Sequence, residues 1–194
     1  MEFLRQVRAA FPRTRIFVST TTLAGRATAG DKLGALADGV FYAPVDYVFA
    51  VRRVLRALRP SVVVIAETEI WPNLFRETKR TGAALTLVNG RVSDKAFPRY
   101  RRWPRFFAAI LPALDAVLAQ SEEMRERFAA LGAPPAKVRV AGNFKYDFEP
   151  RALADGSPVK DLLDRLQPAQ VWIAASTMPP ADPGDDPLPV GAGD

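Results

Sequence analysis

The chain has 194 residues, with 27 Lys and Arg against 21 Asp and Glu, and it contains no histidine and no cysteine. Those two absences exclude disulfides, zinc fingers and catalysis by a histidine base or a cysteine nucleophile. Any catalytic group must therefore be a carboxylate, a lysine, an arginine or a hydroxyl.

Strand-like and helix-like segments alternate along the chain. Periodicity predicts helices over residues 1–11, 47–58, 72–79 and 121–131. It predicts strands over residues 16–22, 40–46, 61–67, 84–88, 115–119 and 137–141. The run 61–67 is apolar on both faces, which is typical of a buried parallel strand. This alternation predicts an α/β fold with a doubly wound parallel sheet.

The C-terminal part of the sequence has a different character. We expect one domain over residues 1–149, a linker and helix over 150–168, and a strand beginning a second domain over 169–177. Residues 178–194 hold five prolines, three glycines and no periodicity, so we expect no independent fold there. No apolar run approaches the ~20 residues of a membrane-spanning helix.

The charge is unevenly distributed. Residues 1–177 carry 27 basic and 17 acidic side chains, whereas residues 178–194 carry four aspartates and no base. Most of the bases are arginines, which bind phosphate and carboxylate in a bidentate fashion. An excess of ten predicts an anionic partner, such as nucleic acid, a phosphorylated small molecule or an acidic membrane surface. The codon bias of a high-GC genome explains the arginines equally well.

The strongest local signal is Glu67-Thr-Glu-Ile-Trp-Pro-Asn73, directly after the most apolar strand. Ligands of open α/β sheets bind beyond the carboxyl ends of the strands. Two neighbouring carboxylates at such a place suit acid–base work or charge stabilisation. Alternatively, Glu67 and Glu69 cap the helix that Pro72 begins. The residues alone do not choose between these interpretations.

Two further polar clusters follow later strands. Asn89-Gly-Arg-Val-Ser93 comes after the strand at 84–88, and Gly142-Asn-Phe-Lys145 comes after the strand at 137–141. Because the carboxyl ends of parallel strands lie along one edge of a sheet, we expect all three clusters on the same rim. Their coincidence favours a functional site.

A basic and aromatic segment lies between these clusters, Arg99-Tyr-Arg-Arg-Trp-Pro-Arg-Phe-Phe107. Such a segment can stack nucleic-acid bases. It can also lie at a membrane interface, with arginines on lipid phosphates and aromatic rings among the headgroups. A solvated segment with its aromatic rings in the core is the third interpretation.

Taken in chain order, the clusters resemble the lipid A Kdo transferases, the 3-deoxy-D-manno-octulosonic acid (Kdo) transferases of lipopolysaccharide synthesis. The resemblance covers residues 1–177 and includes Ala119-Gln120, Arg127-Phe128, residues 131–133 and residues 172–177. It implies a Rossmann-like domain that forms the N-terminal, acceptor-side half of a GT-B glycosyltransferase. The basic and aromatic segment would then face anionic lipid.

The resemblance also implies a chemistry. Kdo would pass from CMP-Kdo to a lipid A precursor at the cytoplasmic side of the bacterial inner membrane, by an inverting reaction without metal or other cofactor. Glu67 and Lys145 would stabilise the transition state. The residues that would bind substrate are Glu69, Asn73, Asn89, Arg91, Ser93, Asn143, Ser176 and Thr177.

Two departures from the family pattern bear on activity. The family's general base is a glutamate in a Ser-x-Gly-Glu loop that precedes the first helix, and its donor domain continues well beyond position 177. This sequence carries neither feature. We therefore expect a truncated fragment that transfers no Kdo by itself. The alternative function is a basic nucleic-acid-binding α/β module, although acidic residues at the rim count against it.

Overall fold

The computed structural model describes residues 2–146 and 158–167, except for the side chains of Lys145 and Val159. The chain divides into two compact units, Met1–Phe148 and Glu149–Asp194. The second unit contributes helix α8 (Pro158–Leu166). The predicted strand at 169–177 and the tail at 178–194 lie outside the described residues, so the predicted domain boundaries stay predictions.

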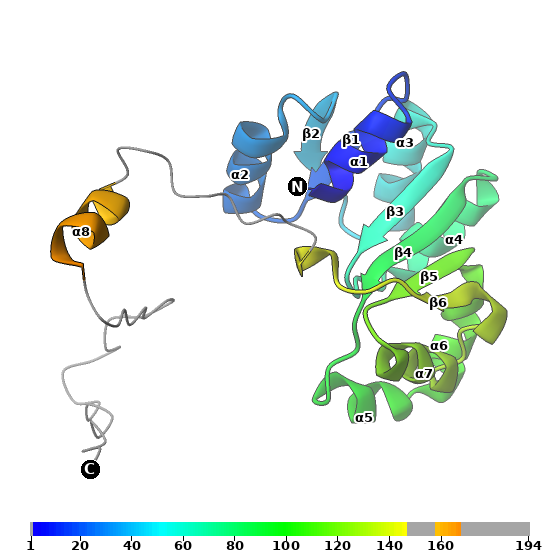
Figure 1. Ribbon diagram of the computed structural model, residues 1–194. Coiled ribbons are helices and arrows are strands. Elements are labelled where there is room, and N and C mark those ends of the chain that lie inside the picture. Colours follow the sequence, from blue (N-terminus) through cyan, green and yellow to red (C-terminus); the bar gives the residue numbers. More distant parts are fainter. Residues whose placement is uncertain (1, 147–157, 168–194) are drawn as a thin grey trace, which may run out of the picture. The chain divides into compact units, whose positions relative to one another are not determined.

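The α-helices and strands alternate along the first unit, except that helices follow one another between residues 90 and 116 (Figure 1). The strands are β1 (Phe17–Thr20), β2 (Gly39–Tyr42), β3 (Val62–Ala66), β4 (Ala84–Gly90), β5 (Ala116–Ala119) and β6 (Val138–Val140). The α-helices are α1 (Glu2–Ala10), α2 (Leu23–Leu33), α3 (Val48–Leu58), α4 (Pro72–Arg80), α5 (Ala96–Arg101), α6 (Pro104–Ile110) and α7 (Glu122–Ala130). Three short 3-10 helices are η1 (Leu111–Ala113), η2 (Pro135–Lys137) and η3 (Phe144–Tyr146). Every predicted strand of this unit is present, and α2, α5 and α6 are additional to the predicted helices.

The strands of the described residues form two parallel sheets. β1 pairs with β2, and the second sheet has the sequential order β3-β4-β5-β6. In its register Ala66 lies opposite Val88, and Ala119 lies opposite Val140. The carboxyl ends of these four strands therefore lie along one edge, which we call the rim.

Helices α4, α6 and α7 lie on one face of the four-stranded sheet (Figure 1). This is the expected arrangement where parallel strands follow one another in order through right-handed crossovers. Side chains from both layers bury a common core, each contributing about 1.5–3 kcal/mol. They include Phe75, Leu85, Leu87, Val117 and Phe128.

β3 is less buried than the sequence predicts. Val62 and Val64 are 52% and 46% exposed, whereas Ile65 belongs to the core and Val63 packs against it. The reason is one-sided packing, because the core lies on the face that carries Val63 and Ile65, while Val62 and Val64 point to the other face. The prediction that 61–67 is buried on both faces is therefore wrong.

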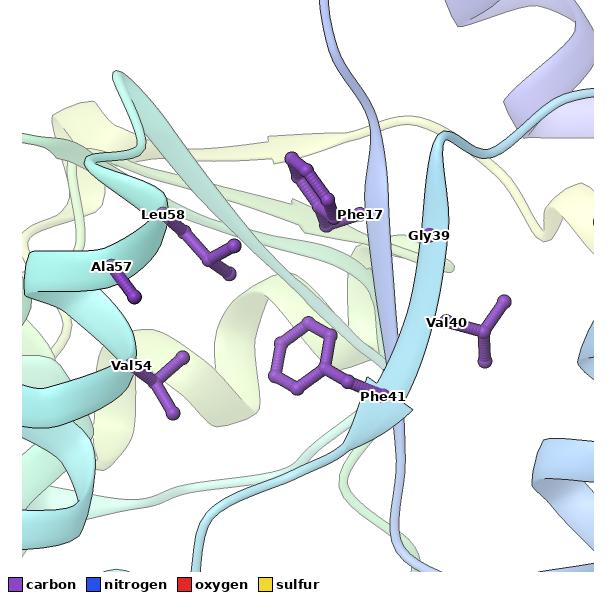
Figure 2. Close-up of a pocket in the computed structure, with 7 residues that line it drawn as sticks. All are labelled: Phe17, Gly39, Val40, Phe41, Val54, Ala57 and Leu58. Carbon is purple, nitrogen blue, oxygen red and sulfur yellow. The ribbon is translucent and has the colours of Figure 1, made fainter.

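An apolar pocket of about 310 Å³ lies between the two-stranded sheet and α3 (Figure 2). Its lining residues are Phe17, Gly39, Val40, Phe41, Val54, Ala57 and Leu58. None of them carries a polar side chain. The lining therefore offers no acid, base or hydrogen-bonding side chain for catalysis.

Candidate functional site

The first rim segment is the acidic loop, residues 67–71, which joins β3 to α4. Its carboxylate-bearing residues Glu67 and Glu69 are both exposed. The Glu67 N–H donates to the carbonyl of Val88 at 2.9 Å. The Thr68 hydroxyl donates to the carbonyl of Arg91 and accepts from the Arg91 N–H at 3.1 Å. These bonds bring the clusters at 67–73 and 89–93 together, as expected from their places after adjacent strands.

Glu67 and Asn89 occupy equivalent positions on neighbouring strands. Each directly follows the paired residues Ala66 and Val88. Both have left-handed backbones, with φ of 62° and 56°. That conformation costs a non-glycine residue roughly 1–2 kcal/mol, and such strain concentrates at active sites and ligand clamps.

The side chain of Asn89 adds a second anomaly. The residue is 2% exposed, yet neither Oδ1 nor Nδ2 has a hydrogen-bond partner among the described residues. Its backbone carbonyl does accept from Nε2 of Gln120 at 3.2 Å. A buried amide left without partners destabilises a fold. Its presence at the rim is therefore better explained by function than by stability.

The remaining rim segments follow β5 and β6. The Gln120 N–H donates to the carbonyl of Gly90 at 3.0 Å, and the Ala141 N–H donates to the carbonyl of Ala119 at 2.9 Å. Asn143 and the backbone of Lys145 lie just beyond, with Lys145 in η3. The third predicted cluster thus shares the rim with the other two. Ser176 and Thr177 lie outside the described residues.

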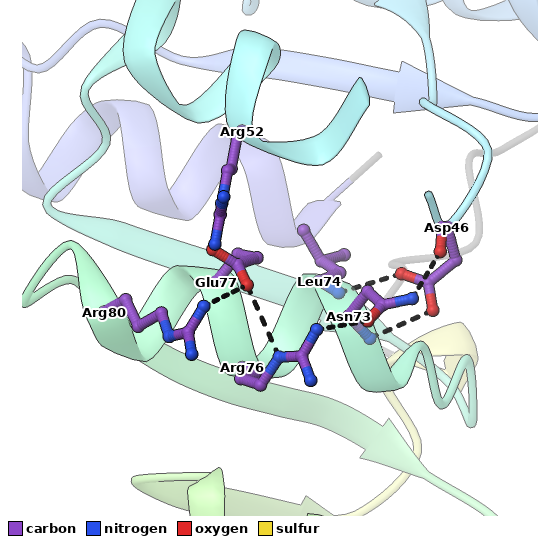
Figure 3. A network of polar contacts seen from close by, with 7 residues as sticks. All are labelled: Asp46, Arg52, Asn73, Leu74, Arg76, Glu77 and Arg80. Carbon is purple, nitrogen blue, oxygen red and sulfur yellow. Dashed lines mark hydrogen bonds and ion pairs between the residues drawn. The ribbon is translucent and has the colours of Figure 1, made fainter. Parts of the chain in front are cut away.

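Helix α4 is capped from a distant segment (Figure 3). The carboxylate of Asp46, in the loop between β2 and α3, accepts from the N–H groups of Asn73 at 3.0 Å and Leu74 at 2.8 Å. The Asn73 amide in turn donates to the Asp46 carbonyl at 2.6 Å. Sequence reasoning missed Asp46, since no local pattern joins residues 27 positions apart.

The hydrogen-bonded cap of α4 is Asp46, whose carboxylate accepts from the first two N–H groups of the helix. The Glu69 carboxylate accepts from the Trp71 indole N–H at 2.8 Å. The interpretation of the two glutamates as stabilising charges at the α4 N-terminus stays a prediction, as does their functional interpretation.

Two predicted site residues have local structural contacts. The Asn73 side chain bonds the Asp46 carbonyl and also accepts from Arg76 at 2.8 Å. The Ser93 hydroxyl accepts from the Ala96 N–H at 3.2 Å, at the start of α5. Both side chains hold the backbone of the rim. The Arg91 side chain is exposed.

A pocket of about 390 Å³ joins the acidic loop to the basic and aromatic segment. Its lining residues are Thr68, Glu69, Ile70, Trp71, Tyr100, Phe106 and Phe107. Phe107 belongs to the core, whereas Trp103 is 67% exposed and Phe106 is also exposed. The segment 99–107 is therefore divided, with part of it in the core and part facing solvent beside the rim.

A basic cluster lies behind the rim, where α3 packs on α4 (Figure 3). Buried Glu77 pairs with Arg52 at 2.7 Å, Arg80 at 2.8 Å and Arg76 at 3.4 Å. The hydrogen bond from Arg52 is the main reason that the pKa of Glu77 lies below its usual value. One carboxylate against three guanidinium groups leaves this surface basic, as the composition predicts.

Within residues 2–146 and 158–167, no group of three or more acidic side chains gathers closely enough to hold a metal ion. The same part of the chain has no helix with the length and apolar character needed to cross a bilayer.

The fold is a Rossmann-like parallel α/β unit of the kind that forms the N-terminal half of GT-B glycosyltransferases, which confirms the predicted fold class. A putative UDP-N-acetylglucosamine 2-epimerase from Listeria monocytogenes shares it with a TM-score of 0.55 at 14% identity, over 83% of this chain and 47% of that one. Residues 1–148 match the family of 3-deoxy-D-manno-octulosonic-acid transferases (kdotransferases). The chain belongs to this family.

Curated relatives support the assignment. The 3-deoxy-D-manno-octulosonic acid transferase of Chlamydophila psittaci is 31% identical over 170 residues, covering 88% of this chain and 39% of the relative. The enzyme of the same name from Haemophilus influenzae is 28% identical over 180 residues, covering 90% and 40%. The chain thus spans about two fifths of the length of these relatives.

Proposed function

We propose that the chain is the acceptor-side part of a glycosyltransferase that transfers Kdo from CMP-Kdo to a lipid A precursor in lipopolysaccharide synthesis. The observation that carries the proposal is the family match over residues 1–148, the same residues that build the rim. The chemistry is an inverting displacement without metal. A carboxylate base takes the proton of the acceptor hydroxyl, the acceptor oxygen bonds to the anomeric carbon of Kdo, and the bond between that carbon and CMP breaks so that CMP leaves.

The rim residues have distinct roles in this proposal. Glu67 and Lys145 stabilise the transition state, with the Lys145 ammonium offsetting negative charge on the donor's carboxylate or phosphate. The substrate-contacting residues are Glu69, Arg91 and Asn143, together with Ser176 and Thr177, whereas buried Asn89 shapes the rim. Asn73 and Ser93 shape the site by holding its backbone. The contacts between the acidic loop and Arg91 support a shared site.

The proposal also includes a location. Exposed Trp103 and Phe106 lie in the same segment as exposed Arg101, Arg102 and Arg105. Aromatic rings and arginines together suit an interface with anionic headgroups. This surface would meet the cytoplasmic side of the inner membrane, where the lipid acceptor resides.

Binding to the acceptor tests the proposal. The purified 194-residue chain is titrated with vesicles that contain a lipid A precursor, with phosphatidylglycerol vesicles of equal charge, and with single-stranded DNA, each across a salt series. We expect preferential binding to the precursor. Arg91→Ala should weaken that binding about ten- to hundredfold, the range for one charge-assisted hydrogen bond.

Arg56→Ala serves as the matched control, because Arg56 is an exposed arginine on α3 and lies outside the rim clusters. It should leave precursor binding within about twofold of the wild type. Equal binding to both kinds of vesicle would contradict the proposal. Stronger binding to single-stranded DNA would favour the nucleic-acid module instead.

A further inference from the structure

We propose that Asp46 is a positioning residue for the acidic loop. By holding the first turn of α4, its carboxylate sets where Glu69 and Trp71 lie relative to the rest of the rim. The inference rests on the proposed function only in taking the acidic loop as part of the site.

The first step is the geometry at the α4 N-terminus. Pro72 has no N–H, and the N-cap residue Trp71 makes no side-chain cap bond. The next two N–H groups, of Asn73 and Leu74, both donate to the Asp46 carboxylate. A carboxylate at this place is favoured both by its hydrogen bonds and by the helix dipole. Asp46 therefore supplies the cap that the local sequence lacks.

The second step is the shortness of the acidic loop. Its five residues connect β3, which is fixed in the sheet, to α4. Its β3 end is held by the bond from Glu67 to Val88, and its middle by the bonds of Thr68 to Arg91. At its far end, Ile70 packs against the core and Trp71 directly precedes the first turn of α4. Displacing the first turn of α4 would therefore displace Trp71 and its partner Glu69.

The third step is what Asp46 connects. It follows β2, whose sheet shares no strand pairing with the four-stranded sheet among the described residues. Further along, the ion pair of Arg52 with Glu77 connects α3 to α4 (Figure 3). Asp46 is thus one contact through which the segment before α3 supports the rim.

The experiment uses the complete 194-residue chain and needs no substrate. Two nuclear magnetic resonance signals report the loop: the Trp71 indole N–H, assigned by Trp71→Phe, and the exchange rate of the Arg91 amide that Thr68 protects. In Asp46→Ala we expect a changed indole shift and about tenfold faster exchange at Asn73, Leu74 and Arg91. Asp46→Asn keeps one acceptor oxygen and should restore part of both effects.

Asp115→Ala is the matched control. The Asp115 carboxylate accepts from the Leu85 N–H at 2.8 Å and from Lys79 of α4, at the opposite edge of the sheet. Its loss should lower stability while leaving the Trp71 and Arg91 signals unchanged. If Asp46→Ala accelerates exchange only at Asn73 and Leu74, Asp46 is a helix cap and the inference is wrong. Should Asp46→Ala fail to fold, the comparison of Asp46→Asn with Asp115→Asn decides in the same way.

Because the readouts involve no ligand, they separate this inference from the proposed function. If the loop moves in Asp46→Ala but the wild-type chain does not bind lipid A precursor, the positioning role is supported and the proposed function is contradicted. If the wild-type chain binds the precursor but the loop does not move in Asp46→Ala, the proposed function is supported and the positioning role is contradicted.

Discussion

Glu67 and Asn89 stand side by side at the rim with left-handed backbones, on adjacent strands of one sheet. Asparagine tolerates this conformation better than most residues, whereas glutamate is rarely found in it. Asn89 also buries an amide that has no partner among the described residues. The left-handed backbones and the buried amide are both unfavourable for stability. Their presence at one place suggests that this local conformation is retained because it serves the functional site.

Substitution of Asn89 separates backbone strain from the amide. Asn89→Gly relieves the left-handed strain and removes the buried amide, so we expect stability equal to or above that of the wild type. Asn89→Ala removes the amide but keeps the strain, and should be roughly 1–2 kcal/mol less stable than Asn89→Gly. Urea unfolding followed by circular dichroism measures both. Equal stability of the two variants would contradict a strained Asn89.

At the scale of elements, each rim loop is held by a residue from a neighbouring element. Asp46 holds the start of α4, and Gln120 bonds Asn89 and Gly90. Arg127 of α7 donates to the Val92 carbonyl at 2.6 Å and pairs with Asp94. Loops joined in this way move together. The rim is therefore one connected structure rather than three independent turns.

Close packing of β4 on α7 gives a prediction for Gly90. A Cβ at this position would lie 2.8 Å from Leu87 Cδ2 and 2.8 Å from Phe128 Cε2, both on fully buried side chains. We expect Gly90→Ala to lower the free energy of unfolding by about 1–3 kcal/mol through overpacking. Urea unfolding measures the change.

Gly30→Ala in α2 is the comparison for Gly90→Ala, because a Cβ at Gly30 would have nothing within 4 Å. It should raise stability by about 0.5–1 kcal/mol, the usual difference between alanine and glycine inside a helix. A neutral Gly90→Ala would show that Leu87 and Phe128 move aside easily.

At the scale of the molecule, several carboxylates have lowered pKa values. A hydrogen bond from the Ile16 N–H is the chief cause at Asp38, one from Lys79 at Asp115, and one from Arg125 at Glu122. Glu77 follows the same rule through Arg52. All four therefore favour the folded state while they are ionised.

The pH dependence of stability follows from these directions. A carboxyl group whose folded pKa lies below its unfolded value contributes stability above the unfolded value and loses it as pH falls through the folded one. The free energy of unfolding should therefore be level near neutral pH and fall once pH drops below the ordinary values of 4.5 and 3.8. Urea titrations between about pH 7 and pH 3 test this.

Glu77→Gln sharpens the test. It should be less stable than the wild type at neutral pH, and the difference should shrink as acid protonates Glu77 in the wild type. Glu126→Gln, an exposed substitution on α7, should change stability little. If the difference in free energy of unfolding between the wild type and Glu77→Gln does not vary with pH, the three arginines do not stabilise the fold through the charge of Glu77.

Local patterns in the sequence were enough to predict most of the fold. The β-branched and apolar run around Val63 predicted β3, and the Ser121-Glu122 pair predicted the start of α7, where the Ser121 side chain accepts from the Met124 N–H. The rim clusters were predictable for the same reason, since each directly follows a strand. Their assembly on one edge needed only the parallel topology.

Other features depended on contacts between distant residues. The exposure of Val62 and Val64 follows from packing on the opposite face of β3 alone, which the placement of distant elements decides. The hydrogen-bonded cap on α4 comes from Asp46, because the turn before α3 lies beside the first turn of α4.

By itself, then, the sequence indicated the family through the resemblance of its motifs. It also determined the alternation of strands and helices and the places where polar residues follow strands, because periodicity and local composition encode these two. The tertiary structure decided which face of β3 is covered, which carboxylate caps α4, and that Asn89 buries its amide. Those outcomes depend on which elements become neighbours after the chain crosses between strands, and no window of consecutive residues contains that information.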